Sequence, residues 1–245
     1  MSRSRIQAVS FDLDGTLLDN TRLQSVIART CELLAENEPA LEARALLEAN
    51  GQIWPGYFQE IEEKRAAGIL DGASVRLEAW RRTLKACNCN DESTAQLAAR
   101  LAAKLGRDAH RLFDDVHEVV GNLRREGIPL ALITNGASDE QREKLEVLGI
   151  EDWFDVIVIR GQHRIAKPDR RIFQLAAKGL RTPEANTCHV GDKLATDILG
   201  ARRAGMTAVW LNRFGMSRQE NDPEPHLEIP SLRMLRRIEI AAALE

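Results

Sequence analysis

The sequence contains no long apolar run and no marked excess of either charge. No segment approaches the roughly 18–20 consecutive apolar residues that span a membrane. The basic N-terminus leads into only a short apolar stretch, which is not the pattern of a secretory signal. With 34 Lys and Arg against 37 Asp and Glu, the net charge of -3 provides no general attraction to nucleic acid or anionic membranes. We therefore expect a cytoplasmic protein that binds neither. The expected oligomeric state, a monomer or a homodimer, is not determined by these features.

Cysteine is also scarce. The chain has four cysteines, Cys31, Cys87, Cys89 and Cys188, and the C-x-C at 87–89 has no second pair at zinc-site spacing. In a reducing cytoplasm such cysteines remain free thiols. The sequence therefore predicts neither a disulfide framework nor a structural zinc site.

The pattern of the chain changes after its first apolar segment. Residues 6–11 are short, apolar and partly β-branched, which predicts a buried strand, and an acidic turn follows. From about residue 21 to 104 the chain is rich in Ala, Leu, Glu and Arg, and its spacing predicts four or five helices without a strand. The expected helical segments include 57–67, 74–86 and 92–105. Breaks between helices are expected at Pro39, Gly51, Pro55, Gly68, Gly72 and 88–90.

From about Val116 onward, apolar strands alternate with amphipathic helices, which predicts a parallel sheet covered on both faces. The expected strands are 130–134, 156–159, 187–190 and 207–211. The expected helices are 115–126, 138–148, 169–179, 195–204 and one near 231–242. We therefore predict an α/β core formed by residues 1–18 and 109–245. Residues 19–108 are predicted to be an all-helical insert, a lid beside the edge where open α/β sheets bind ligands.

Polar residues that could act in catalysis or metal binding lie at or just after the C-terminal ends of the predicted strands. Asp12 and Asp14 follow the first strand, Thr134 ends the second, Lys167 lies in the loop after the third, and Asp192 follows the fourth. Because the C-terminal ends of parallel strands share one edge of a sheet, we expect these residues to converge.

These residues stand in four motifs that resemble those of the haloacid dehalogenase superfamily, in its phosphatase branch with a helical cap. In the order of that family, the motifs are FDLDGTL at 11–17, ITNG at 133–136, KPD at 167–169 and VGDKLATD at 190–197. The resemblance covers nearly the whole chain. It implies a Rossmann-like core domain and an inserted helical cap of the C1 type.

The resemblance also implies roles for the acids. Asp12 is then the nucleophile that forms an aspartyl-phosphate, and Asp14 is the general acid and later the general base. Two carboxylates facing a phosphate need a hard cation, and the family pattern implies Mg²⁺ held by Asp12, the Asp14 carbonyl and Asp192. Asp197 is expected to hold a water or Lys167.

The remaining motif residues are expected to bind the phosphoryl group. Lys167 balances charge between the nucleophile and the phosphate, and Thr134 supplies a hydroxyl. Backbone N–H groups of Asn135 and Gly136 complete the predicted phosphate cradle. Thr134 and Lys167 are thus expected to be catalytic as well as substrate-binding residues.

The predicted activity is magnesium-dependent hydrolysis of a small phosphorylated metabolite. Within the superfamily the chain most resembles bacterial phosphatases of flavin mononucleotide and related ribityl phosphates. N-acylneuraminate 9-phosphatases, nucleotidases and sugar-phosphate phosphatases are alternatives. Dehalogenation is disfavoured, because Asp14 would have no leaving group to protonate. A phosphomutase uses the same two acids, and a non-catalytic binding or regulatory protein would be expected to depart from the motifs.

Other conspicuous residues are assigned no chemistry. None of the five histidines is placed as a ligand or base, and His189 is expected to be a core residue of its strand. The aromatic cluster of the insert, Trp54, Tyr57 and Phe58, is expected to form part of the core of the cap. The alternative is that it packs on an apolar leaving group.

Overall fold

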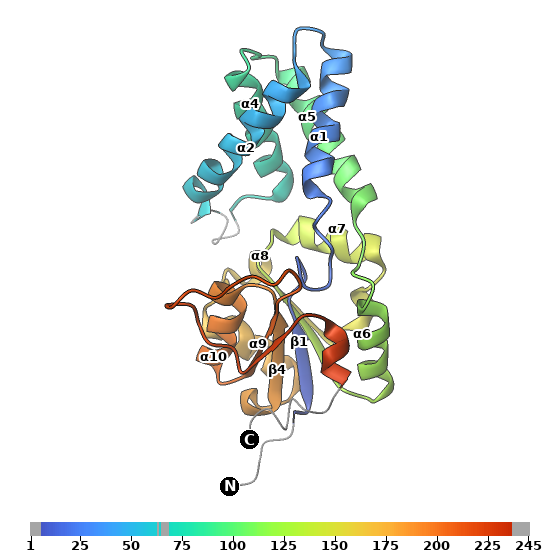
Figure 1. Cartoon of the computed structure of the whole chain (residues 1–245), viewed down its shortest axis with the longest axis vertical. Helices are drawn as coiled ribbons and strands as arrows, with labels where there is room; N and C mark the ends of the chain where they lie inside the picture. Colours follow the sequence, from blue (N-terminus) through green and yellow to red (C-terminus); the bar gives the residue numbers. More distant parts are fainter. Residues whose placement is uncertain (1–5, 63, 65–68, 237–245) are drawn as a thin grey trace. The chain divides into compact units, whose positions relative to one another are not determined.

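The computed structural model describes residues 6–62, 64 and 69–236 (Figure 1). The chain divides into two compact units. The first takes its residues from Met1–Asp19, Arg111–Gly136 and Leu148–Glu245, and the second from Asn20–His110 and Ala137–Val147. Within the described part of the chain, every helix is too short or too polar to span a membrane.

The first unit is built on a six-stranded parallel sheet with the order β3-β2-β1-β4-β5-β6. Its strands are β1 (Ala8–Phe11), β2 (Leu130–Thr134), β3 (Val156–Ile159), β4 (Thr187–Gly191), β5 (Thr207–Leu211) and β6 (Leu227–Ile229). All five expected strands are confirmed. The additional edge strand, β6, has only three residues, too few to show an alternating pattern. Phe11 pairs with Leu132 on one side and Val190 on the other, so the three central strands end at nearly the same level.

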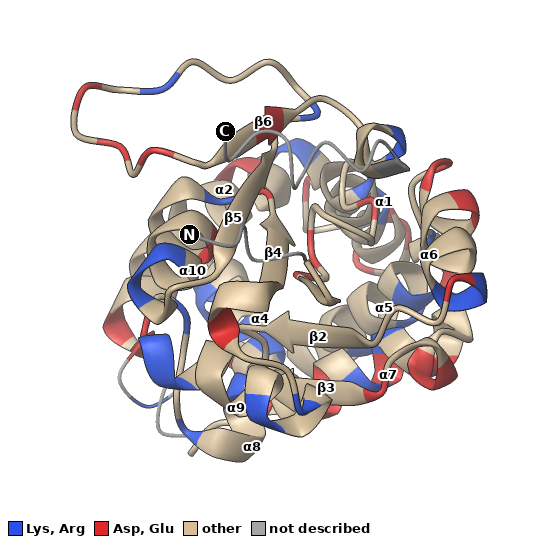
Figure 2. Ribbon diagram, turned by 90° about the horizontal axis from the view of Figure 1, so that it is seen from below, with Lys and Arg blue, Asp and Glu red and all other residues tan. Residues whose placement is uncertain are grey.

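Helices cover both faces of this sheet, as the alternating pattern predicts. The helices are α6 (Val116–Arg125), α8 (Arg160–His163), α9 (Arg170–Leu180) and α10 (Leu199–Ala204). Single turns are η1 (Glu151–Trp153), η2 (Glu184–Asn186), the π-helical η3 (Leu194–Ile198) and η4 (Leu232–Arg236). Figure 2 shows α9 and α10 on one side of the sheet and α6 on the other. Apolar side chains of α9, such as Ile172 and Phe173, pack with Ala131 and Ile133 of β2.

Two expected helices of this unit differ from the structure. The segment predicted as one helix over 195–204 is a π-helical turn followed by α10. The expected final helix near 231–242 begins as the short turn η4, and residues 237–245 lie outside the described residues.

The second unit is all helical in its described residues. It contains α1 (Leu23–Asn37), α2 (Ala43–Glu60), α4 (Gly72–Ala86), α5 (Glu92–Ala109) and nearly all of α7 (Ser138–Leu148). The core includes the fully buried side chains of Leu34, Leu46, Trp80 and Leu84. α7 joins this unit through polar contacts with the insert, among them the Asp139 carboxylate accepting from the Gly72 N–H at 3.0 Å.

The predicted breaks at Gly51 and Pro55 are wrong, because α2 continues through both residues. A proline inside a helix costs about 3 kcal/mol, but tertiary packing supplies most helical stability in proteins. α2 packs against α4, and its buried Asn50 side chain donates to Thr83 Oγ1 at 3.2 Å. That packing holds the helix together through Pro55. The predicted helix over 57–67 is the end of α2 as far as Glu60, and residues 63 and 65–68 lie outside the described residues.

The aromatic cluster of the insert belongs to the core of its own unit. Tyr57 is buried in a group with Ile61, Val75 and Ala79, and Trp54 and Phe58 pack against that group. The rings of Trp54 and Phe58 lie 4.7 Å apart between centroids. The expected role in the core of the insert is therefore confirmed.

Candidate active site

The acidic motif after β1 forms a tight turn. The Leu13 carbonyl accepts hydrogen bonds from the N–H groups of Thr16, Leu17 and Leu18, at 3.3, 3.0 and 2.8 Å. Gly15 closes the turn with φ +89°, a conformation that favours glycine. The turn leaves Asp12 buried directly at the end of β1, with Asp14 partly buried two residues later.

Lys167 is the cation of the site, and its side chain is buried. Its Nζ lies 2.5 Å from Asp12 Oδ1 and 2.6 Å from Asp197 Oδ1, and donates to the Ile133 carbonyl at 2.9 Å. A lysine ammonium has three N–H donors, so all three are engaged. Burial alone would lower the pKa of Lys167, but Asp12 and Asp197 outweigh burial and raise it. The side chain is therefore a permanent cation that holds one oxygen of Asp12.

The loop carrying Lys167 is held by Asn135. The Asn135 side chain donates from Nδ2 to the Lys167 carbonyl at 2.9 Å and accepts from the Lys167 N–H at 2.8 Å. This pair of bonds positions the Lys167 backbone beside the end of β2. The sequence pattern predicts only a backbone role for Asn135, because nothing in a single sequence indicates a partner 32 residues away.

Thr134 is buried at the last position of β2. Because Phe11 pairs with Leu132, Asp12 stands level with Ile133, and Thr134 lies one residue beyond along the same edge. Gly136 follows in the same turn. The structure therefore brings the four motifs to one edge of the sheet, as predicted.

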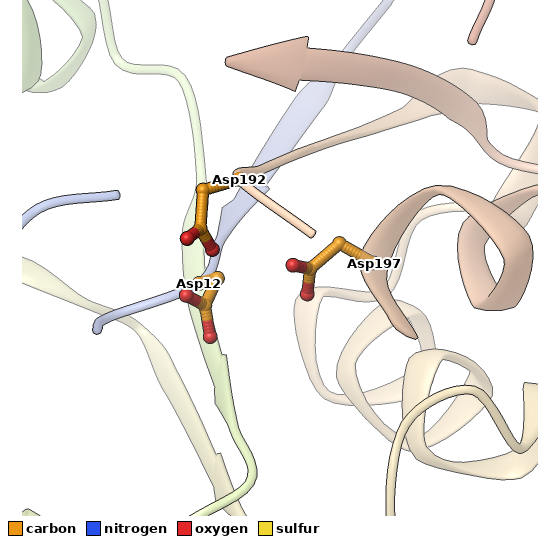
Figure 3. A group of neighbouring side chains, drawn as sticks. All are labelled: Asp12, Asp192 and Asp197. Atoms are coloured by element: carbon orange, nitrogen blue, oxygen red, sulfur yellow. The ribbon is translucent and has the colours of Figure 1, made fainter. Parts of the chain in front are cut away.

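Three carboxylates meet at this edge. Figure 3 shows the side chains of Asp12, Asp192 and Asp197 directed toward one another, and one oxygen from each lies within 4.8 Å of the others. Asp192 Oδ1 is buried without a hydrogen-bond partner among the described residues, which is the state expected of a ligand oxygen that faces a cation. Asp12 and Asp192, with the adjacent Asp14 carbonyl, are oxygen donors of the kind Mg²⁺ prefers.

Asp197 differs from the other two acids because its oxygens are occupied. Oδ1 contacts Lys167 Nζ at 2.6 Å and His189 Nε2 at 3.4 Å, and Oδ2 accepts from the Lys193 N–H at 3.0 Å. This geometry fits an acid that holds Lys167 better than one that binds a metal.

The acids have very different proton affinities. Burial, reinforced by Asp197 and Asp192, raises the pKa of Asp12 to about 7 despite Lys167. Burial and Asp197 raise the pKa of Asp192 to about 6. Burial also opposes ionisation of Asp197, but Lys167 and His189 outweigh it and lower the pKa of that carboxyl. The site therefore has an excess of buried negative charge that a divalent cation would relieve.

A model of the haloacid dehalogenase-like hydrolase family matches residues 6–205. The chain therefore belongs to this family of hydrolases. It is 36% identical to a phosphoserine phosphatase of Thermus thermophilus over 80% of this chain and 68% of that protein. It is 31% identical to N-acylneuraminate-9-phosphatase of Mus musculus over 95% of both chains.

Two further proteins are similar over nearly their full length. One is 5-amino-6-(5-phospho-D-ribitylamino)uracil phosphatase of Escherichia coli, 30% identical over 94% of this chain and 95% of that protein. The other is the crystal structure of a 2-haloacid dehalogenase from Pseudomonas syringae, which is 26% identical with a TM-score of 0.69. That likeness covers 98% of this chain and 100% of the other.

Proposed function

We propose that this chain is a magnesium-dependent phosphomonoester hydrolase that acts on a small phosphorylated metabolite through an aspartyl-phosphate at Asp12. The observation that carries the proposal is the pairing at Asp12, where Lys167 Nζ lies 2.5 Å from Oδ1. Asp192, whose Oδ1 has no hydrogen-bond partner among the residues that the structure describes, lies in the same acidic cluster. Three relatives of the chain are named as phosphatases, which supports the same class of reaction.

Asp12 is the proposed nucleophile. With Oδ1 held by Lys167, the carboxylate is fixed, and its other oxygen is available for in-line attack on phosphorus. A P–O bond forms to Asp12 as the P–O bond to the leaving oxygen breaks. Asp14 donates its proton to that oxygen, then takes a proton from the water that hydrolyses the aspartyl-phosphate. Thr134 Oγ1 and the N–H groups of Asn135 and Gly136 are proposed to hold the phosphoryl oxygens.

The residues present fit a magnesium ion. Asp12, the Asp14 carbonyl and Asp192 would hold it. When bound, the cation neutralises charge on the carboxylates and on the phosphoryl oxygens. Lys167 has its donors engaged by protein oxygens, so we propose that it acts first by orienting Asp12 and reaches a phosphoryl oxygen only by exchanging one of those bonds.

The proposed substrate is flavin mononucleotide or a related ribityl phosphate. A relative aligned over almost its whole length is named for a phosphoribitylamino compound, at 30% identity. N-acylneuraminate 9-phosphate and phosphoserine, from the names of other relatives, are the competing choices. We also propose that residues 19–108 are a helical cap domain inserted into a core domain of residues 1–18 and 109–245.

The test is release of inorganic phosphate from para-nitrophenyl phosphate and from a panel of these metabolites, with Mg²⁺ and with EDTA. We expect activity only with Mg²⁺, abolished in Asp12→Asn. Asp14→Asn should impair hydrolysis of alkyl phosphates more than that of para-nitrophenyl phosphate, whose leaving group needs little protonation. The control is Asp114→Asn, an exposed aspartate before α6, which should be as active as the wild type.

The proposal fails if wild-type protein releases no phosphate from any substrate with Mg²⁺, or if Asp12→Asn retains full activity. Release of halide from a 2-haloacid without metal would instead identify a dehalogenase. Conversion of a sugar phosphate to its isomer without free phosphate would identify a mutase.

A further inference from the structure

Two polar residues lie inside buried strands directly beneath the proposed catalytic edge. Ser10 of β1 and His189 of β4 are partners in the strand register, and both are fully buried. Ser10 Oγ lies 2.9 Å from His189 Nδ1, and the opposite ring nitrogen, Nε2, lies 3.4 Å from Asp197 Oδ1. Asp197 in turn contacts Lys167, which holds Asp12. A continuous polar chain thus runs from the interior of the sheet to the nucleophile.

The number of available protons determines the direction of these hydrogen bonds. A neutral imidazole carries one N–H, and a serine hydroxyl donates one hydrogen bond. Asp197 Oδ1 contacts the Lys167 ammonium at 2.6 Å and Oδ2 accepts from the Lys193 N–H, so this carboxyl is ionised and only accepts. An unprotonated Nε2 would direct its lone pair at that carboxylate. The favourable arrangement therefore places the imidazole proton on Nε2, where it faces Asp197 Oδ1.

Ser10 completes this arrangement. With the proton on Nε2, Nδ1 is an acceptor, and the Ser10 hydroxyl donates to it at 2.9 Å. The same hydroxyl has a second acceptor in reach, the Cys188 carbonyl at 3.2 Å, which it would use if Nδ1 carried the proton. A doubly protonated ring is disfavoured, because burial lowers the pKa of His189 and outweighs Asp197, which acts to raise it. The ring is therefore neutral.

We propose that His189, in the Nε2–H form that Asp197 favours, is a positioning residue that orients Asp197 and thereby holds Lys167 against Asp12. The inference rests on the proposed function, because its effect appears in the turnover of phosphomonoester. His189 is fully buried inside β4, so its role is indirect. Outer partners that orient catalytic ligands typically contribute about 10- to 100-fold. At 3.4 Å the His189 contact is long, so we expect the lower end, a loss of about tenfold in kcat with KM unchanged.

The experiment compares His189→Gln with His189→Leu. Glutamine keeps an N–H donor that can reach Asp197, whereas leucine fills similar space without one. We expect kcat to fall about tenfold in His189→Leu and to recover most of that loss in His189→Gln, with equal KM. Ser10→Ala should reduce kcat about threefold, because the ring then loses the hydrogen bond that fixes its orientation at Nδ1. The ¹⁵N chemical shifts of the imidazole should show the Nε2–H form in wild type.

Phe173→Leu is the matched control for packing. The Phe173 ring lies edge-on to the His189 ring at 4.9 Å between centroids, outside the hydrogen-bonded chain. Its replacement should lower Tm while leaving kcat within twofold of wild type. A purely structural His189 would behave in the same way.

Equal kcat in His189→Leu and His189→Gln, or wild-type kcat in both, overturns the inference. An Nδ1–H tautomer in wild type also overturns it, and that measurement needs neither activity nor a stable Leu variant. Absence of phosphatase activity in wild type refutes the proposed function instead. The two failures are therefore distinguishable.

Discussion

Gly15 leaves no room for a side chain beside Asp192. A Cβ on Gly15 would lie 2.4 Å from Asp192 Oδ2, and φ at Gly15 is +89°. The turn after β1 and the loop after β4 are therefore in direct contact. Because Gly15 has no side chain, the Asp192 carboxylate can lie against its backbone. Glycine in the first motif is thus required by both backbone conformation and space.

The first prediction concerns this contact. Gly15→Ala should displace Asp192, weaken Mg²⁺ binding at least tenfold and destabilise the fold by about 1–3 kcal/mol, the usual cost of a strained backbone conformation. Urea unfolding and titration with Mg²⁺ measure the two effects. Gly106→Ala is the control, because a Cβ at Gly106 inside α5 would have no neighbour within 4 Å among the described residues outside its own helical turn. That variant should be unchanged or slightly more stable, and equal behaviour of the two would contradict the prediction.

The second prediction separates the two acids of the fourth motif. Asp192→Asn should weaken Mg²⁺ binding by about 10- to 100-fold, because none of the described residues donates a hydrogen bond to Asp192 Oδ1. Asp197→Asn should leave Mg²⁺ affinity within a few-fold of wild type but lower kcat, because Asp197 contacts Lys167 and the Lys193 N–H. Calorimetric titration and steady-state kinetics measure these quantities. Comparable loss of Mg²⁺ affinity in both variants would show that Asp197 is a ligand.

The third prediction is a pH dependence of metal binding. Without metal, the raised pKa values of Asp12 and Asp192, about 7 and about 6, mean that protons occupy these carboxylates in weakly acidic solution. Mg²⁺ must displace those protons, so its affinity should fall as pH decreases from 8 to 6. The increase of Tm caused by saturating Mg²⁺ should accordingly be larger at pH 8 than at pH 6. A Tm increase independent of pH over this range would refute proton competition.

The fourth prediction concerns Asp115, the buried residue before α6. Its carboxylate accepts from Arg213 at 2.8 and 2.9 Å, from Ser231 Oγ at 2.6 Å and from the Leu232 N–H at 2.9 Å. Burial favours the neutral acid, but these partners, Arg213 foremost, lower the pKa of Asp115. Asp115→Asn should therefore destabilise the protein by about 3 kcal/mol at neutral pH, because it leaves Arg213 without its partner.

The sign of the pH effect follows from that lowered pKa. The pKa of the Asp115 carboxyl is lower in the folded protein than in the unfolded chain, where it is about 4. Its contribution to stability is therefore complete above about pH 4 and is lost as the pH falls through the pKa of the folded state. The difference between wild type and Asp115→Asn should stay constant from pH 8 to 5 and shrink below about pH 4. Urea unfolding across this range measures it, with Asp114→Asn as the exposed control. A difference that grows on acidification would contradict the assignment.

Much of this protein was predictable from sequence because its signals are local. The strand at 130–134 is a short apolar run before a turn, and the acids at 12 and 192 stand directly after such runs. Parallel pairing then requires those ends to share an edge. The interruption at Pro55 was predicted wrongly for the opposite reason: α2 is stabilised by its packing against α4, which no local pattern contains.

The sequence by itself determined the α/β class, the order of the strands along the chain and which motif residues meet at one edge of the sheet, because hydrophobic periodicity and motif order are properties of the chain. Only the tertiary structure decided which hydrogen-bond and ion-pair partners each of those residues has. Asp197 contacts Lys167, whereas Asp192 Oδ1 has no hydrogen-bond partner in the described part of the chain. The Asn135 side chain holds the loop of Lys167. These assignments depend on hydrogen-bond partners 30 or more residues apart in sequence, which only folding brings within 3 Å.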